Sequence, residues 1–281
     1  MAALKNKIDF VALISVTNAN GNGDPLNGNR PRTDYNGMGE ISDVCIKRKL
    51  RNRMQDMGNA IFVQSEDRCD DGFKSLSDRA TAATKGIKEK ETYAQTACEK
   101  WMDVRSFGQV FAFKSNDKSG VSVGVRGPVS IHQAVSISPV EIEEMQITKS
   151  VNGETGEKRS SDTMGTKHFV RFGFYEIKGA INVQLAEKTG FSQEDAAVVQ
   201  ECLRTLFAND ASAARPEGSM EVVKLFWWEH NCKEGQYSSA KVHRSVHVTP
   251  KNPEGIPTCV NDYEITLDEL PGLVPEIIDG V

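Results

Sequence analysis

Residues 9–53 constrain the fold of this 281-residue chain more than any other segment. They begin with an apolar run at residues 10–16, continue as a polar loop rich in glycine and asparagine at residues 17–32, and end in a segment with helical periodicity. A short apolar run is typical of a buried strand, and glycine and asparagine accept the positive φ angles of sharp turns. The segment therefore predicts a buried strand, an irregular loop with many amide groups, and a helix.

The predicted helix carries a dense run of cations. Ser42 suits the N-cap and Gly58 suits the position after the C-cap. One apolar stripe recurs with helical spacing, at Ile46, Leu50, Met54 and Met57. The cations beside it are Lys47, Arg48, Lys49, Arg51 and Arg53. Like charges one turn apart repel, and the ordinary explanation is a solvated basic face; next to an amide-rich loop, however, the run favours the phosphate backbone of a nucleic acid.

The loop does not match the common nucleotide-binding fingerprints. Gly23 and Gly28 have the spacing of a P-loop, but residues 29–30 are Asn-Arg where Lys-Ser or Lys-Thr is needed. Gly21 and Gly23 begin a dinucleotide fingerprint, but Leu26 replaces its third glycine. A plain surface loop remains the alternative to a loop that binds phosphates through amides.

Charge and composition restrict the function classes. The formal net charge is −5, which argues against a uniformly basic nucleic-acid binder and requires a local basic groove. Residues 262–281 hold six carboxylates and no lysine or arginine. The six cysteines form no C-x-x-C pair, which is typical of reduced thiols in a cytoplasmic protein. Neither an eighteen-residue apolar run nor a signal peptide is evident, so no membrane association is expected.

The middle of the chain predicts a projecting hairpin and a second irregular loop. Residues 145–151 suit an outgoing strand, and Asn152-Gly153 is a strong tight-turn signal. Met164, an apolar residue beside a glycine in a polar segment, is a candidate wedge at the hairpin's end. The second loop, residues 209–220, contains Arg215.

Other patterns predict the remaining elements. We expect a helix over residues 87–101, a strand carrying Arg126 over 121–131, and strands over 168–177, 179–185, 222–230 and 241–248. Ser192 and Asp195 form a predicted capping box at the start of a helix. Three phenylalanines could belong to the core or line a groove, namely Phe107, Phe111 and Phe113. The coarse order of elements is that of an α+β, ferredoxin-like β-α-β-β-α-β fold, which RNA-recognition modules share.

No catalytic constellation stands out in the sequence. His243 and His247 are expected to share a strand face, but without a third ligand nearby a metal site is not expected, and no cofactor is implied. The main alternative to a binding function is a metal-independent endoribonuclease with His168, His230, His243 or His247 as general base. A third possibility is an interaction module for an acidic protein.

Several segments together resemble one protein family. They are residues 18–25, 31–32, 39–52, 104–108, 126–130, 163–168 and 210–215. The chain resembles the backbone subunit of the type I CRISPR Cascade surveillance complex, in its type I-C (Dvulg) branch of the RAMP superfamily. Pro216 departs from the glycine expected after the arginine.

The resemblance implies a single domain, residues 1–281, with an RNA-recognition-like palm. A helical finger insertion at residues 59–120 and a β-hairpin thumb at residues 138–168 would interrupt it. Copies of the subunit would form a helical filament on the crRNA guide, and the guide would pair with target DNA. Further partners would be the large subunit, the small subunit and the crRNA-processing cap subunit. The thumb would be mobile in the isolated subunit and ordered only against a neighbour.

On this basis we expect the guide backbone to contact residues from three segments and two isolated arginines. They are Asn18, Asn20, Gly21, Asn22, Lys47, Arg48, Arg51, Arg126, Met164, His168 and Arg215. Lys49 and Arg53 are left open because they could instead face the core or another subunit. No residue is assigned to catalysis or to a metal.

Overall fold

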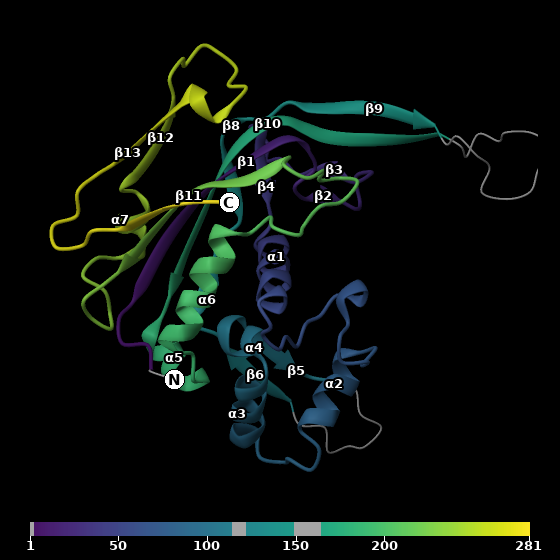
Figure 1. Cartoon of the computed structure of the whole chain (residues 1–281), viewed down its shortest axis with the longest axis vertical. Coiled ribbons are helices and arrows are strands. Elements are labelled where there is room, and N and C mark those ends of the chain that lie inside the picture. Colours follow the sequence, from purple (N-terminus) through teal and green to yellow (C-terminus); the bar gives the residue numbers. More distant parts are fainter. Residues whose placement is uncertain (1–2, 114–121, 149–163) are drawn as a thin grey trace, which may run out of the picture.

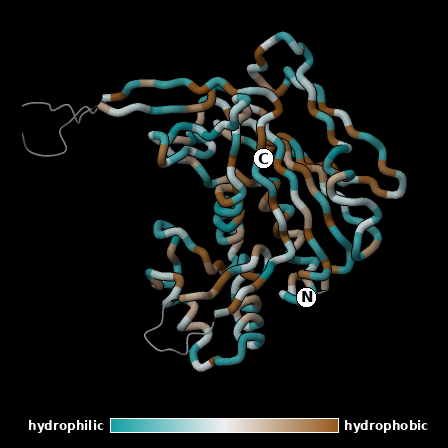
Figure 2. The backbone as a smooth tube through the Cα atoms, turned by 180° about the vertical axis from the view of Figure 1, so that it is seen from behind, coloured by the Kyte–Doolittle hydropathy of each residue, from teal (hydrophilic) through white to brown (hydrophobic). Residues whose placement is uncertain are grey.

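The computed structural model describes residues 3–113, 122–148 and 164–281. It is a mixed α/β structure built on a large antiparallel sheet, whose central strands hold most of the hydrophobic stretches (Figures 1 and 2). The strand order is β14-β11-β1-β10-β8-β4, and β7 and β9 also pair with β10. The eight strands are β1 (Ile8–Ala19), β4 (Met38–Ile41), β7 (Val129–Ile131), β8 (Ala134–Pro139), β9 (Ile142–Thr148), β10 (Met164–Ile181), β11 (Met220–Glu229) and β14 (Glu276–Asp279).

The predicted apolar run becomes β1, the centre of the sheet. β1 pairs with β10 on one side and with β11 on the other, antiparallel in both cases. Successive side chains of a strand point to opposite faces, and both faces of β1 are covered. Phe10, Ala12 and Ile14 belong to a core with helices, whereas Val11 and Leu13 belong to a separate core on the opposite face.

Helices cover one face of the sheet. α1 and α6 contribute buried side chains to the core that contains Phe10, among them Leu50 of α1 and Val199 of α6. The opposite face is covered by α7 and by the two-stranded sheet of β12 and β13. The helices and this small sheet are α1 (Asp43–Asp56), α5 (Val183–Thr189), α6 (Gln193–Arg204), α7 (Ser239–His243), β12 (Val246–Pro250) and β13 (Tyr263–Leu267).

A smaller lobe with its own core lies below the sheet in Figure 1. Its elements, which we call the α2–α4 lobe, are α2 (Leu76–Ala83), α3 (Lys90–Lys100), α4 (Met102–Phe107), β5 (Gly108–Phe111) and β6 (Val123–Arg126). Phe111 is one of its buried residues, while Phe113 is partly buried against the same core. Phe107 packs against the main core instead. The three phenylalanines are therefore mainly packing residues.

Local signals predicted the two main helices well. The Ser42 hydroxyl accepts a hydrogen bond from the Cys45 N–H at the start of α1, and the capping box of Ser192 and Asp195 opens α6. The apolar stripe of α1 is buried except for its last member, Met57, which is exposed because it is the C-cap, beyond the last helical turn.

Three predicted strands are wrong in part. The strand expected over residues 179–185 stops at Ile181, because the Asn182 side chain accepts the Leu185 N–H and starts α5. The strand expected over 241–248 is α7 followed by β12, because Ser238 caps a short helix. The strand expected over 121–131 is divided between β6, which pairs with β5, and β7, which pairs with β10.

Candidate nucleic-acid interface

The glycine-rich loop follows β1 and leads to β4, which precedes α1; it contains two short strands, β2 (Gly23–Asp24) and β3 (Arg30–Pro31). Its polar groups hold it in place. The Asn20 side chain donates to the Asn29 carbonyl at 2.6 Å, and the Asn22 side-chain oxygen accepts from the Ser42 N–H at 2.9 Å. The loop is thus closed on itself and fastened to the start of α1.

The four predicted loop contacts differ in exposure. Asn18 is exposed and adopts a φ of 50°, whereas Asn20 and Gly21 are buried and Asn22 is partly buried. A Cβ at Gly21 would lie 3.0 Å from Cδ1 of Ile41, so this position is tightly packed. Asn18 is therefore the one of the four that offers its side chain directly to a ligand, while the other three build the loop.

The second irregular loop lies against the first. The Asn20 N–H donates to the Ala214 carbonyl at 2.9 Å, and the Thr17 N–H donates to the Ser219 carbonyl at 2.8 Å. The sequence predicted both irregular loops but did not indicate that they are neighbours. Their backbone hydrogen bonds make one continuous surface.

Lys49 and Arg215 fasten the same junction through a shared carboxylate. Lys49 of α1 forms a buried ion pair with Asp210, and Nε of Arg215 lies 3.0 Å from an oxygen of the same Asp210. Burial lowers the pKa of Lys49, while the negative charge of Asp210 opposes that shift. Lys49, which the sequence left open, faces the second loop.

The other α1 cations are also engaged. Lys47 pairs with Asp43 one turn earlier at 2.9 Å, on the solvent side of the helix. Arg48 donates to the Val63 carbonyl at 2.6 Å, and burial lowers its pKa. Arg53 pairs with Asp56 and donates to the Thr205 hydroxyl. The basic run is thus partly a set of structural links.

Of the five cations, Arg51 pairs with the most deeply buried carboxylate. Its Nε lies 2.9 Å from Oδ2 of Asp103, a carboxylate that is 1% exposed. Asp103 also accepts hydrogen bonds from the N–H groups of Phe62 and Val63. The Arg51 guanidinium lies over the Phe107 ring, 5.1 Å from its centroid. Arg51 therefore joins α1 to the α2–α4 lobe, and any phosphate it binds must share it with a buried partner.

The predicted hairpin is a projecting arm made by β9 and residues 164–170 of β10 (Figure 1), which we call the β9–β10 arm. The strand expected at residues 145–151 begins earlier, at Ile142. Asn152-Gly153 and Thr163 lie outside the described residues. Met164, paired with Thr148, is 61% exposed at the outer end of the described arm.

The two faces of the arm differ. Met164 shares a face with His168, whereas Met145 and Ile147 lie opposite Lys167 and Gly165 on the other face. Met145 and Ile147 are both about half exposed. The sequence singled out Met164 and missed this second apolar pair, although strict alternation along β9 would have revealed it.

The base of the arm contacts the glycine-rich loop. Arg30 of β3 pairs with Glu144 of β9 at 3.1 Å, and Nδ1 of His168 lies 3.7 Å from the same carboxylate. A Cβ at Gly28 would be 3.9 Å from Nε2 of His168. The structure therefore places His168 beside Gly28 of the glycine-rich loop, the same loop that is hydrogen-bonded to the start of α1.

Arg126 lies apart from this surface. It is an exposed residue of β6 in the α2–α4 lobe, paired across the strands with Gly108. The loops and the arm belong to the other side of α1 in Figure 1. Arg126 is therefore not brought to the loops, and the recorded partners of Arg48 and Arg51 are also outside the loops, at Val63 and Asp103.

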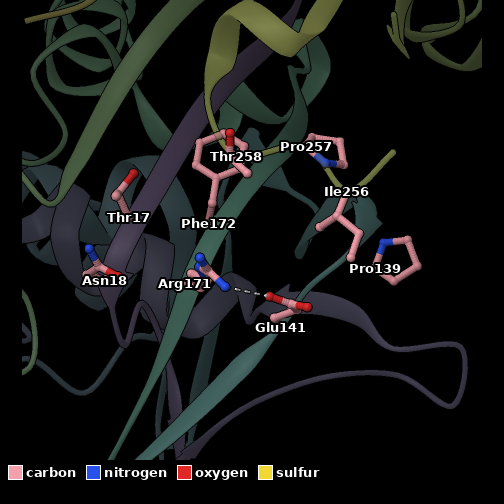
Figure 3. A pocket seen from close by; sticks show the side chains of 9 residues that line it. All are labelled: Thr17, Asn18, Pro139, Glu141, Arg171, Phe172, Ile256, Pro257 and Thr258. Atoms are coloured by element: carbon pink, nitrogen blue, oxygen red, sulfur yellow. Dashed lines mark hydrogen bonds and ion pairs between the residues drawn. The ribbon is translucent and has the colours of Figure 1, made fainter. Parts of the chain in front are cut away.

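A cavity of about 290 Å³ adjoins Asn18 (Figure 3). Phe172 and Arg171 of β10 line it, and Arg171 is 3.5 Å from Glu141 across the opening. The sequence placed both β10 residues in a strand without assigning them a role. The cavity extends the polar surface of the first loop onto the opposite face of the sheet.

His230 and His243 both approach the buried carboxylate of Asp9, His243 at 3.9 Å, whereas His168 and His247 lie elsewhere. His230 is buried, and its Nε2 lies 2.8 Å from Oδ2 of Asp9. His243 is buried at the end of α7 with Nε2 2.9 Å from the Gly179 carbonyl. His247 lies in β12 and pairs with Asp268, so the expectation that it shares a strand face with His243 is wrong. Burial would raise the pKa of Asp9, but hydrogen bonds from His230, Ser239 and Lys7 outweigh it and lower the pKa.

The described residues hold neither a metal-binding group nor a membrane-spanning helix. In residues 3–113, 122–148 and 164–281, no group of three or more His, Cys, Asp or Glu is arranged to hold a metal ion. Within those same ranges, no helix is both long and apolar enough to cross a membrane.

Comparisons with known proteins agree on one family. The family model described as CRISPR-associated protein Cas7 matches residues 6–268. A curated relative of that description from Haloferax volcanii is 27% identical over 207 residues, which cover 68% of this chain and 61% of the relative. A solved structure described as "CRISPR RNA-guided surveillance complex, pre-nicking" covers 84% of this chain and 81% of its own at a TM-score of 0.53 and 17% identity, a similarity of fold.

Proposed function

Because this chain belongs to the CRISPR-associated Cas7 family, we propose that it is a backbone subunit of an RNA-guided surveillance complex. Several copies bind one crRNA as a helical filament and leave its bases free to pair with target DNA. Sequence is then read by base pairing, and the protein needs to grip only ribose and phosphate. The family match supports this proposal, as does the similarity of fold to a chain of a surveillance complex.

One structural observation carries the RNA-binding part of the proposal. Separate segments form one surface: the two loops through Asn20 and Ala214, α1 with the second loop through Lys49 and Asp210, and the first loop with the arm through Arg30. Amide groups, cations and exposed apolar residues, among them Leu26 and Met164, line this surface. Cations suit the phosphate backbone, and exposed apolar side chains suit contact with bases without reading their sequence.

The free-energy cost of breaking each existing ion pair ranks the α1 cations as phosphate ligands. An exposed ion pair such as Lys47–Asp43 is worth about 0–1 kcal/mol, so phosphate can replace Asp43 at little cost. Separating Arg51 from buried Asp103 costs much more, about 3–5 kcal/mol. Lys47 is therefore the α1 cation that can bind phosphate at the lowest cost, and Arg48 ranks second. Arg51 stays paired with Asp103 and contributes to the positive electrostatic potential of the surface.

We extend the proposal to the other expected contacts and to the architecture. Asn18 and the loop backbone at Asn20, Gly21 and Asn22 bind the guide, with Arg215 beside them, His168 and Met164 from the arm, and Arg126 at a separate point. β11, β1, β10 and β8 with α1 and α6 form a ferredoxin-like palm, supported by their antiparallel order. The finger insertion, residues 59–120, holds the α2–α4 lobe except for β6, and the thumb, residues 138–168, holds the arm except for residues 169–170.

The finer assignment is to a type I-C complex, in which this subunit does not cut RNA and requires no cofactor. Its partners there are the large, small and crRNA-processing subunits, and its compartment is the cytoplasm. The burial of His230 and His243, which approach the same buried Asp9, supports a non-catalytic role, because RNA cannot reach either ring without a rearrangement.

The proposal is tested by purifying the tagged protein from cells that transcribe a CRISPR array. RNA of one uniform length, with several protein copies on each molecule, is the expected result. Recovery without RNA, or with RNA of random length, contradicts it. A second incubation, with repeat RNA in a chelator, separates binding from cleavage, because turnover abolished by a single histidine substitution establishes an endoribonuclease instead.

A further inference from the structure

The two edges of the large sheet are treated differently. At one edge, β4 is covered by the chain before it: the Glu40 N–H donates to the Arg32 carbonyl, and Thr33 bridges to Gly39. At the other edge, β14 pairs only with β11 among the described strands. An open strand edge offers unpaired backbone groups to another chain. The β14 edge is therefore a docking candidate.

A groove of about 230 Å³ lies beside this edge, between α6 and β11. We call it the acidic groove; it is lined chiefly by Gln193, Ala196, Gln200, Trp227, Glu229 and Glu276. Gln193 donates to Glu229 at 3.4 Å and Gln200 donates to Glu276 at 2.9 Å. Within the described residues, neither carboxylate forms an ion pair. Two carboxylates near an indole ring attract a cationic side chain and repel phosphate.

One exposed apolar side chain adjoins the two carboxylates. Val274 lines the groove and is exposed, beside the open edge of β14. The acidic and apolar lining therefore fits a basic protein segment rather than a nucleic acid.

The charge distribution of the chain points to the same kind of partner. Residues 262–281 hold six of the 39 carboxylates, so residues 1–261 contain 33 carboxylates and all 34 lysines and arginines. The exposed turn from the end of α2 to the first residue of α3 contains Lys85, Lys88 and Lys90 against one carboxylate, Glu89, and Gly86 gives the turn its positive φ of 83°. None of these lysines forms an ion pair with another described residue. The turn lies at the lower end of the molecule in Figure 1, and β14 lies in the upper half.

We propose that the acidic groove binds the lysine turn, residues 84–90, of a second copy of this chain. The contact joins two different patches, so it is heterologous, and successive copies continue in one direction instead of closing as a dimer. The inference rests on the proposed multi-copy function and names the protein surface that links neighbours. It uses no residue assigned above to the RNA.

A charge-exchange experiment on the full chain tests the contact. Glu229→Lys with Glu276→Lys reverses the groove, and Lys85→Glu with Lys88→Glu reverses the turn. All four positions are exposed, so the fold should survive. Glu264→Lys with Glu269→Lys is the matched control, because it makes the same charge change outside the groove. Sedimentation then measures the number of copies on an unstructured RNA long enough for several copies, at physiological salt.

Each reversed protein should show an association constant between neighbours that is lower by about tenfold or more, whereas the control pair should not change it. Mixing the two reversed proteins should restore alternating contacts, and the protein carrying all four changes should assemble nearly as well as the wild type. Assembly of the reversed proteins like the wild type, or no recovery in the fourfold variant, overturns the proposal.

A parallel measurement on a short RNA that holds one copy separates this inference from the proposed function. If the wild type fails to bind that RNA, the proposed function fails and the groove assignment falls with it. If every variant binds it equally and all assemble equally, only the groove assignment is overturned.

Discussion

Helix α1 and the β9–β10 arm are both proposed RNA contacts, but they are built in opposite ways. All five cations of α1 already have partners within the chain, and Arg51 reaches a buried carboxylate. The arm projects from the sheet and leaves Met164 and Met145 exposed, on opposite faces (Figure 1). A basic support tied into the fold and an exposed apolar arm therefore share one proposed RNA surface.

The comparison shows that charge density in a sequence does not measure the charge available to a ligand. Like charges one turn apart would destabilise an isolated helix. Here four of the five cations pair with carboxylates, two from α1 itself, one from the α2–α4 lobe and one from the second loop. The helix can then stay folded without RNA. The apolar residues of the arm have no such partners among the described residues, so their stabilisation must come from whatever the arm binds.

The largest expected effect concerns the support of α1. Asp103→Ala removes the acceptor of Arg51 and of two backbone N–H groups. The free energy of unfolding should fall by about 3–5 kcal/mol, because a buried charge loses its partner. Asp43→Ala, which removes the exposed partner of Lys47, should cost at most about 1 kcal/mol. Urea unfolding without RNA measures both; equal losses would show that α1 is not held through Asp103.

A smaller effect distinguishes an α1 cation that binds RNA from one that stabilises the fold. Lys47→Ala should reduce the slope of log affinity against log salt by about 0.7 on single-stranded RNA, with little loss of stability. Arg51→Ala should instead lower the free energy of unfolding, because it leaves Asp103 unpaired. Fluorescence anisotropy over a salt series gives the slopes. An unchanged slope in Lys47→Ala would remove α1 from the interface.

The smallest effect is expected on the arm. Met164→Gly should change the free energy of unfolding by no more than about 0.5 kcal/mol, because the side chain is exposed. It should alter which target positions tolerate mismatches more than it alters overall RNA affinity, since a wedge acts at one base step. Met145→Gly, on the opposite face, is the control. Identical mismatch profiles for the two variants would refute Met164 as the wedge.

The sequence predicted what is local. The Ser42 cap, the capping box of Ser192 and Asp195, and the buried run of β1 depend on neighbouring residues and are confirmed. The strand predictions failed where a cap overrode an apolar pattern, at Asn182 and at Ser238.

The links within the candidate site could not be predicted in the same way. Arg51 and Asp103 are 52 positions apart, and Lys49 and Asp210 are 161 positions apart. No local pattern encodes such pairs, because they arise only when the sheet brings distant segments together. For the same reason, the contact between the two irregular loops was visible only in the structure.

Hydrogen exchange of the free protein and of its RNA assembly tests the central claim most directly. The account predicts new protection in the first loop, in the exposed face of α1 and in residues 142–148 and 164–170, with the largest change in the arm. Residues 246–250 and 263–267, the paired strands on the covered opposite face, should exchange equally in both states. Equal protection of the arm in the two states, or protection confined to those two strands, would contradict the proposed RNA surface.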